Sequence, residues 1–135
     1  MRNGILYVAL FAFLFSCNSN DDATSSETEL IGTWKLVENY ADPGDGSGDF
    51  ETVDSNKTIQ FHSDGSITSN GSLCDMSIQS TTPTSGTYSS TDFTINSEDC
   101  TNSSGFNITY TMNNSFLTIS YPCIESCLSK YVKVQ

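Results

Sequence analysis

The chain has 135 residues and a formal net charge of −11, because 16 residues are Asp or Glu and only five are Lys or Arg. A surface of this charge repels phosphate backbones, which excludes nucleic acid as a partner. The length allows one domain with a modest hydrophobic core.

The N-terminal segment has the pattern of a secretory signal. An apolar run from Ile5 to Phe15 follows the single charge of Arg2. The run is too short to cross a bilayer as a helix, which needs about 20 apolar residues, but it has the length of the hydrophobic region of a signal peptide. We therefore predict that residues 1–16 are a signal peptide.

Cys17 ends a lipobox-like sequence. Leu14-Phe15-Ser16-Cys17 resembles the cleavage and acylation site of bacterial lipoproteins. The resemblance implies that Cys17 carries lipid and anchors the chain to a membrane; the alternative is an ordinary signal peptide that ends at a chance cysteine. Residues 17–29 then form a lipidated flexible tether, because they lack the large apolar side chains that would offset the entropy of ordering.

Two acids, Asp21 and Asp22, lie just after the lipobox. Acids at this place resemble a signal for export to the outer leaflet in some Gram-negative lineages. We therefore expect an outer-membrane lipoprotein on the periplasmic face or the cell surface, and the acids favour the cell surface.

Strand signals dominate the chain from Leu30 onward. The sequence is rich in Thr, Ser, Tyr, Phe, Ile and Val, and no apolar pattern with helical spacing is sustained. Alternation of apolar and polar residues predicts antiparallel strands with one wet face. Eight strands are predicted, over residues 30–40, 56–62, 66–73, 85–90, 92–97, 105–112, 115–121 and 128–134.

An even number of alternating strands lets the last strand pair with the first, so that the sheet closes into a barrel without edges. The even-numbered connections are short, and two of the three contain an Asp-Gly or Asn-Asn step suited to a hairpin. The odd-numbered connections are longer and gather at the opposite end. They contain nine acids, which are Asp42, Asp45, Asp49, Glu51, Asp54, Asp75, Glu98, Asp99 and Glu125. The predicted object is a cup with a plain base and an acidic rim.

The remaining cysteines, Cys74, Cys100, Cys123 and Cys127, all lie in the rim connections. An even number of cysteines in a small exported domain indicates two disulfides. We favour the pairs Cys74–Cys100 and Cys123–Cys127, while the two other pairings remain open. A zinc site of four thiolates is the competing interpretation, and the spacing of Cys74 and Cys100 disfavours it.

The sequence Gly32-Thr33-Trp34 resembles the Gly-x-Trp motif on the first strand of lipocalins. The resemblance implies that Trp34 closes the base of the barrel and that a basic residue of the last strand packs across it. Lys133 is the candidate, although the family more often has Arg at that place.

A wider stretch, Leu30–Glu38, together with Cys123 and Cys127 before the last strand, resembles the lipocalin-like domains of Gram-negative lipoproteins. The resemblance implies an all-β, eight-stranded, antiparallel up-and-down barrel over residues 30–135. The alternative is a β-sandwich with an ordinary core tryptophan.

The sequence predicts neither an enzyme nor a cofactor. His62 is the only histidine and is expected on the outer face. The segment Asp42-Pro-Gly-Asp-Gly-Ser-Gly-Asp49 contains carboxylates and glycines suited to calcium, but it lacks the EF-hand order, so a solvated turn is preferred.

The predicted function is a non-catalytic binding module that acts through the barrel mouth or the rim loops, with Asp42, Asp45 and Asp49 as candidate contact residues. The alternatives are a carrier of a small hydrophobic molecule and a structural surface protein without a ligand. A filled barrel cannot carry, while small Ser69 and Gly71 on the inner face could leave space. The predicted inward set is Trp34, Leu36, Ile59, Phe61, Tyr88, Phe93, Ile95, Phe106, Ile108, Tyr110 and Leu117.

Overall fold

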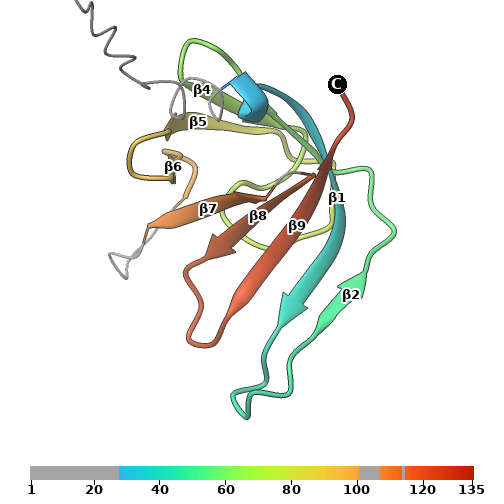
Figure 1. Cartoon of the computed structure of the whole chain (residues 1–135). Helices are drawn as coiled ribbons and strands as arrows, with labels where there is room; N and C mark the ends of the chain where they lie inside the picture. Colours follow the sequence, from blue (N-terminus) through green and yellow to red (C-terminus); the bar gives the residue numbers. More distant parts are fainter. Residues whose placement is uncertain (1–27, 101–106, 114) are drawn as a thin grey trace, which may run out of the picture.

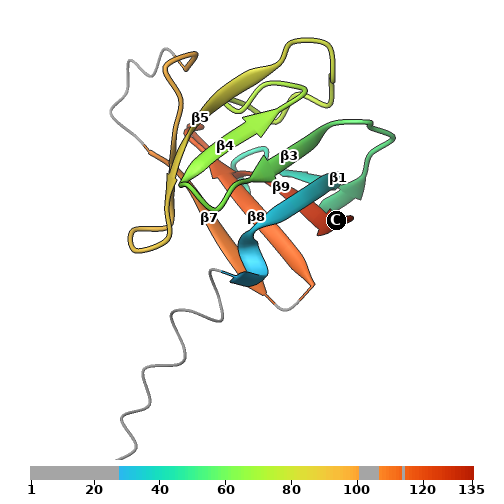
Figure 2. The same ribbon diagram turned by 90° about the horizontal axis from the view of Figure 1, so that it is seen from above.

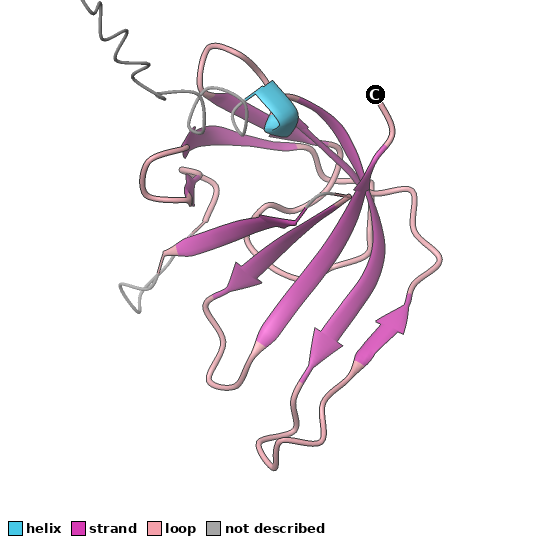
Figure 3. Ribbon diagram, in the orientation of Figure 1, coloured by secondary structure: helices cyan, strands magenta, loops and turns pink. Residues whose placement is uncertain are grey.

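The computed structural model describes residues 28–100, 107–113 and 115–135, so the predicted signal peptide and Cys17 lie outside the described residues. Apart from a helical turn at residues 28–30, the described elements are strands (Figure 3). The strands are β1 (Gly32–Ala41), β2 (Phe50–Thr52), β3 (Thr58–Phe61), β4 (Ser66–Ser69), β5 (Thr84–Ser89), β6 (Thr94–Asn96), β7 (Ile108–Asn113), β8 (Phe116–Tyr121) and β9 (Cys127–Lys133).

Eight of these strands form a closed antiparallel barrel, which confirms the predicted fold. Each strand from β3 to β9 pairs with its neighbour in the chain, and β9 returns to pair with β1. The closing pair is long, and it sets Trp34 opposite Lys133 and Ala41 opposite Cys127. Figure 1 shows β4 and β5 at the top of the view with β7 and β8 below them, and Figure 2 shows β3 beside β4.

The short strand β2 was not predicted, because the Asp- and Gly-rich sequence before it reads as one long loop. β1 pairs with β3 along its first half and with β2 along its second half. The change of partner occurs at Val37, where the register between β1 and β9 shifts by a β-bulge. A bulge bends its strand. Consequently residues 53–57 pass over the bend, and Ser55 and Lys57 are buried there.

Inward alternation produces one continuous core. Trp34, Tyr131 and Leu117 are among the side chains with 2 % exposure or less. The structure corrects one predicted member, because Phe93 is 52 % exposed. It lies in the turn after β5 with φ of 55°, and this left-handed conformation turns its side chain out of the alternation. Phe106 lies outside the described residues.

The two ends of the barrel differ as expected. The base holds the short connections after β3, β5 and β7, together with the helical turn and the C-terminus. The rim holds the longer connections, including residues 42–49, 70–83 and 122–126. Within the described ranges, no helix has the length and apolar character needed to span a membrane.

Candidate functional site

Trp34 closes the base of the barrel. Its indole Nε1 donates a hydrogen bond of 2.8 Å to the carbonyl of Leu30, which lies in the helical turn. The ammonium of Lys133 lies 5.6 Å from the centre of the Trp34 ring and donates to the carbonyl of Glu29 at 2.6 Å. A cation at this distance from an indole face is attracted by the ring. The base is therefore sealed by groups from both ends of the domain.

Gly32 permits this seal because it has φ of +134°, a conformation that other residues rarely adopt. A Cβ atom built there would also lie only 2.2 Å from the carbonyl oxygen of Gln135. The C-terminal segment reaches β1 through this gap, since the amide of Thr33 donates to the same oxygen at 2.7 Å.

The three candidate rim acids hold the 42–49 loop in shape. Asp42 accepts hydrogen bonds from the amides of Gly44 and Gly46 at 2.7 and 3.1 Å. The bond from Gly44 is the main reason that the pKa of Asp42 is lowered. Hydrogen bonds from Ser47 likewise lower the pKa of Asp45.

Asp49 likewise accepts a hydrogen bond, from the amide of Phe50 at 2.7 Å. All three carboxylates therefore already have partners in the chain segment that carries them. Their first role is to fix the loop, and a change at any of them would alter the loop as well as its charge.

A second rim loop packs beside this one. The amide of Asp42 donates to the carbonyl of Ser126 at 3.2 Å, and the side chain of Glu125 lies against Gly44. Cys123 and Cys127 close the second loop with a disulfide that spans only four positions. Ile124 stands at its tip and is fully exposed. We call the 42–49 loop and the 122–126 loop together the rim pair.

The second disulfide joins Cys74 to Cys100, so both preferred pairings are confirmed. Cys74 begins a segment that crosses the barrel mouth, residues 74–79, which we call the lid. The disulfide fastens this segment to the connection that follows β6.

Four consecutive carbonyls of the lid accept hydrogen bonds from side chains of the barrel wall. Lys57 donates to the carbonyls of residues 75 and 77, at 3.2 and 2.9 Å. Asn39 Nδ2 donates to that of Met76 at 2.9 Å, and Ser55 Oγ donates to that of Ile78 at 2.7 Å. The Met76 side chain packs partly buried against the core. The lid therefore closes the mouth from inside.

Lys57 is the unusual member of this arrangement, because its exposure is 0 %. Within the described part of the chain, no carboxylate forms an ion pair with it. Burial lowers the pKa of its ammonium from 10.5 to about 8, although the charge of Asp75 opposes the shift. Its nearest ring is that of Tyr121, with the centre 5.9 Å from Nζ. A buried lysine is rarely left without an anionic partner.

Two phenols lie beneath Lys57. The hydroxyls of Tyr121 and Tyr131 are 3.2 Å apart, and burial raises the pKa of both. Beside them, Ser129 donates to Asn39 Oδ1 at 2.7 Å, and the amide of Asn39 holds the lid. The upper barrel thus contains a polar layer above an apolar core.

The family model described as Lipocalin-like domain matches residues 30–97. The chain belongs to this family. Comparisons with curated proteins and with solved structures found no match. The lipocalin-like barrel suggests a binding function for small hydrophobic molecules. The geometry restricts where such binding can occur.

The interior of this lipocalin-like domain holds little free space beside Ser69 and Gly71, where the sequence predicted a gap. The predicted gap at Ser69 and Gly71 is filled by Lys57, whose Cγ and Cδ would lie 3.2 and 3.3 Å from a Cβ at Gly71. Ser69 Oγ donates to the carbonyl of Thr58 at 3.0 Å. A ligand could therefore enter the upper barrel only if the lid moved.

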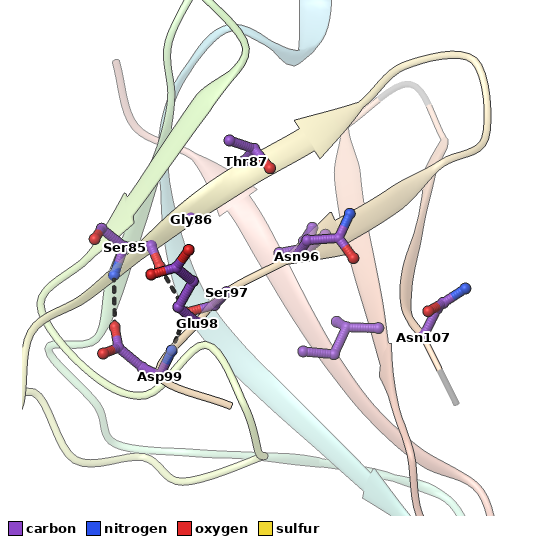
Figure 4. A pocket seen from close by; sticks show the side chains of 10 residues that line it. Ser85, Gly86, Thr87, Asn96, Ser97, Glu98, Asp99 and Asn107 are labelled. Carbon is purple, nitrogen blue, oxygen red and sulfur yellow. Dashed lines mark hydrogen bonds between the residues drawn. The ribbon is translucent and has the colours of Figure 1, made fainter. Parts of the chain in front are cut away.

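A pocket of about 530 Å³ lies against β5, β6 and the start of β7 (Figure 4). Ile95 and Ile108 contribute to its lining. Asp99 accepts from the amide of Ser85 at 3.3 Å, and Ser97 Oγ donates to the Ser85 carbonyl at 2.6 Å. These hydrogen bonds fasten the connection that follows β6 to strand β5.

In the part of the chain that the structure describes, His62 contacts a threonine hydroxyl. Its Nε2 lies 3.2 Å from the hydroxyl of Thr68, on an exposed part of the wall. Among the residues that the structure describes, no three His, Cys, Asp or Glu side chains gather as metal ligands would.

Sequence reasoning missed Lys57 as a site residue. The signal was present, because Lys57, Ile59 and Phe61 alternate and so share one face of the strand predicted over residues 56–62, although β3 itself begins at Thr58. The lid was read as a loop, but its position across the mouth depends on long-range hydrogen bonds that no local pattern reports.

Proposed function

We propose that the protein is a membrane-anchored, non-catalytic binding module whose rim pair contacts a cationic protein partner. The observation that carries this proposal is Ile124, a fully exposed apolar side chain at the tip of a disulfide-closed turn. Fixed loops lose little conformational entropy on binding, so they suit a recognition surface.

The surroundings of Ile124 indicate the charge of the partner. Glu125 lies next to it and packs on the acidic 42–49 loop. Ile124 is an apolar contact surrounded by carboxylates, so it fits a partner whose apolar pocket is surrounded by Lys or Arg. Such binding weakens as salt screens the charges.

Lipid on Cys17 would orient the rim pair relative to the membrane. The described chain begins at Thr28, at the base of the barrel, so a tether attached there would leave the rim facing away from the membrane. Mass spectrometry of the mature N-terminus tests the anchor, with an acylated Cys17 expected. The variant Cys17→Ser should release the protein from membranes, and an unmodified terminus elsewhere would contradict the anchor.

The rim is tested without disturbing the loop-forming acids. In native membranes, Ile124→Ser should reduce the recovery of bound partner at least tenfold, because burial of one isoleucine contributes about 1.5–3 kcal/mol. Val134→Ser is the matched control, since Val134 is also exposed but lies at the base. Equal recovery with both variants would contradict the proposal and favour a structural surface protein.

A small-molecule carrier is the second candidate, and membership of the lipocalin-like family favours it. Transport inside the barrel would require displacement of the lid. A ligand site in the mouth would therefore be distinct from the rim pair.

A further inference from the structure

We propose that Lys57 is the head-group residue of a latent site for small amphipathic anions, and that the lid occupies this site in place of the ligand. The inference goes beyond the rim pair, because it concerns the interior of the mouth. The lid accepts the hydrogen bonds of the side chains that face the mouth from the barrel wall.

The lid has the chemistry of an amphipathic ligand. It supplies carbonyl oxygens to the Lys57 ammonium at 3.2 and 2.9 Å, and it places the Met76 side chain against the core. An acidic molecule with a short apolar tail offers the same two elements. Its carboxylate would replace the carbonyls, and its tail would replace the thioether of Met76.

A carboxylate is a better partner for Lys57 than the carbonyls are. The Lys57 ammonium already makes charge-assisted hydrogen bonds to the lid carbonyls, and a carboxylate would add the attraction between opposite charges. Lys57 is fully buried, and the described carboxylates do not pair with it. A ligand that supplies the missing charge therefore has a differential affinity for the open state, which is the condition for shifting the lid.

The groups around Lys57 support this assignment. Asp75 belongs to the lid, so its charge would leave when the lid moves, while Tyr121 and Tyr131 remain as neutral hydroxyls near the head group. Asn39 and Ser55 would lose their lid carbonyls and become free donors toward the same anion. The exposed positions of Asp75 and Ile78 are consistent with a segment that touches solvent on its outer side.

Octanoate is a suitable probe, and the mature chain carrying Cys17→Ser avoids the lipid and micelles. Calorimetric titration should show binding of octanoate, reduced at least tenfold in Lys57→Met and retained in Lys57→Arg. Lys130→Met is the matched control, because Lys130 lies on the wall in an ion pair with Glu38. Met76→Ala should bind octanoate more tightly, since its lid competes less well.

Neutral and cationic probes test the head-group assignment. 1-Octanol and octylammonium should bind more weakly than octanoate; equal binding of 1-octanol would overturn the assignment to Lys57. Hydrogen exchange on the wild-type chain gives a measurement that needs no Lys57 variant. Octanoate should accelerate exchange in residues 74–79 and leave β1 and β9 unchanged, and unchanged exchange at saturating octanoate would overturn the displacement of the lid.

Salt separates this site from the rim pair. The acidic rim repels octanoate, so its affinity should rise as salt screens the rim, whereas binding of a cationic partner should fall. Absence of octanoate binding in both the wild-type chain and Met76→Ala would overturn the site and leave the rim proposal unaffected.

Discussion

Replacement of Lys57 by methionine should change how stability depends on pH. The folded-state pKa of Lys57 is about 8, below the value of 10.5 for an exposed lysine. Between these two pH values the unfolded chain holds a proton that the folded chain has lost. The unfolding free energy of the wild type therefore rises with pH in this window, relative to that of Lys57→Met.

The expected magnitude follows from the two pKa values. The rise is at most about 1.4 kcal/mol for each pH unit, and roughly 3 kcal/mol in total. Below pH 8 the difference between the proteins should be flat. Its size there reflects two opposing effects, because the variant removes the buried charge but leaves the carbonyls of Asp75 and Ser77 without their donor.

Urea denaturation at pH 7, 8, 9 and 10 measures this difference, with fluorescence of the single tryptophan, Trp34, as the signal. The phenols Tyr121 and Tyr131 have raised pKa values and lower the stability above pH 10, but they are present in both proteins. Lys130→Met controls for the loss of a lysine elsewhere. A difference that stays constant from pH 7 to pH 10 would refute the burial of a charged Lys57.

Three further predictions concern the frame of the site. Gly32→Ala should destabilise the domain by several kcal/mol, because the position has φ of +134° and a Cβ would meet Gln135; an unchanged urea midpoint would contradict this packing. Loss of the Cys74–Cys100 disulfide through a double change to alanine should cost about 3.5 kcal/mol by the loop-entropy estimate, against about 2 kcal/mol for Cys123–Cys127, and thermal unfolding should rank the two variants in this order. Asp42→Ala should accelerate exchange of the Gly44 and Gly46 amides, whereas Glu51→Gln should not; because the pKa of Asp42 is lowered, the support that its carboxylate gives the loop should be lost as the pH falls below 3.8.

The barrel could be predicted from sequence because its determinants are local. Alternation along strands such as Ile108–Asn113 fixes an inner face, and an even number of strands permits closure. The same parity places all four rim cysteines at one end, where it allowed the preferred pairing of Cys74 with Cys100 and left the two other pairings open.

The features that were missed depend on long-range geometry. β2 consists of three residues after a Gly-rich turn, and it exists because β1 changes partner at Val37. Phe93 follows the strand pattern, but its turn conformation exposes it. The lid has no periodic pattern, since side chains more than 15 residues away hold its carbonyls.

The acids of the 42–49 loop illustrate a different limit. Composition identified Asp42, Asp45 and Asp49 as candidate contact residues, and the structure shows that each accepts a hydrogen bond from a backbone amide close to it in the chain. Asp and Asn often fold turns in this way. Charge alone therefore did not distinguish carboxylates that form the loop from carboxylates that are free to bind a partner. The full exposure of Ile124 became visible only in the structure.

Site-specific photo-crosslinking in intact cells tests the binding function most directly. A photoreactive residue placed at position 124, in the rim pair, is compared with the same residue at position 134, at the base. The account predicts that position 124 gives a discrete protein adduct, that the adduct diminishes as salt is raised, and that position 134 gives none. Adducts of equal yield from both positions, or no adduct from position 124, would contradict the assignment of binding to the rim.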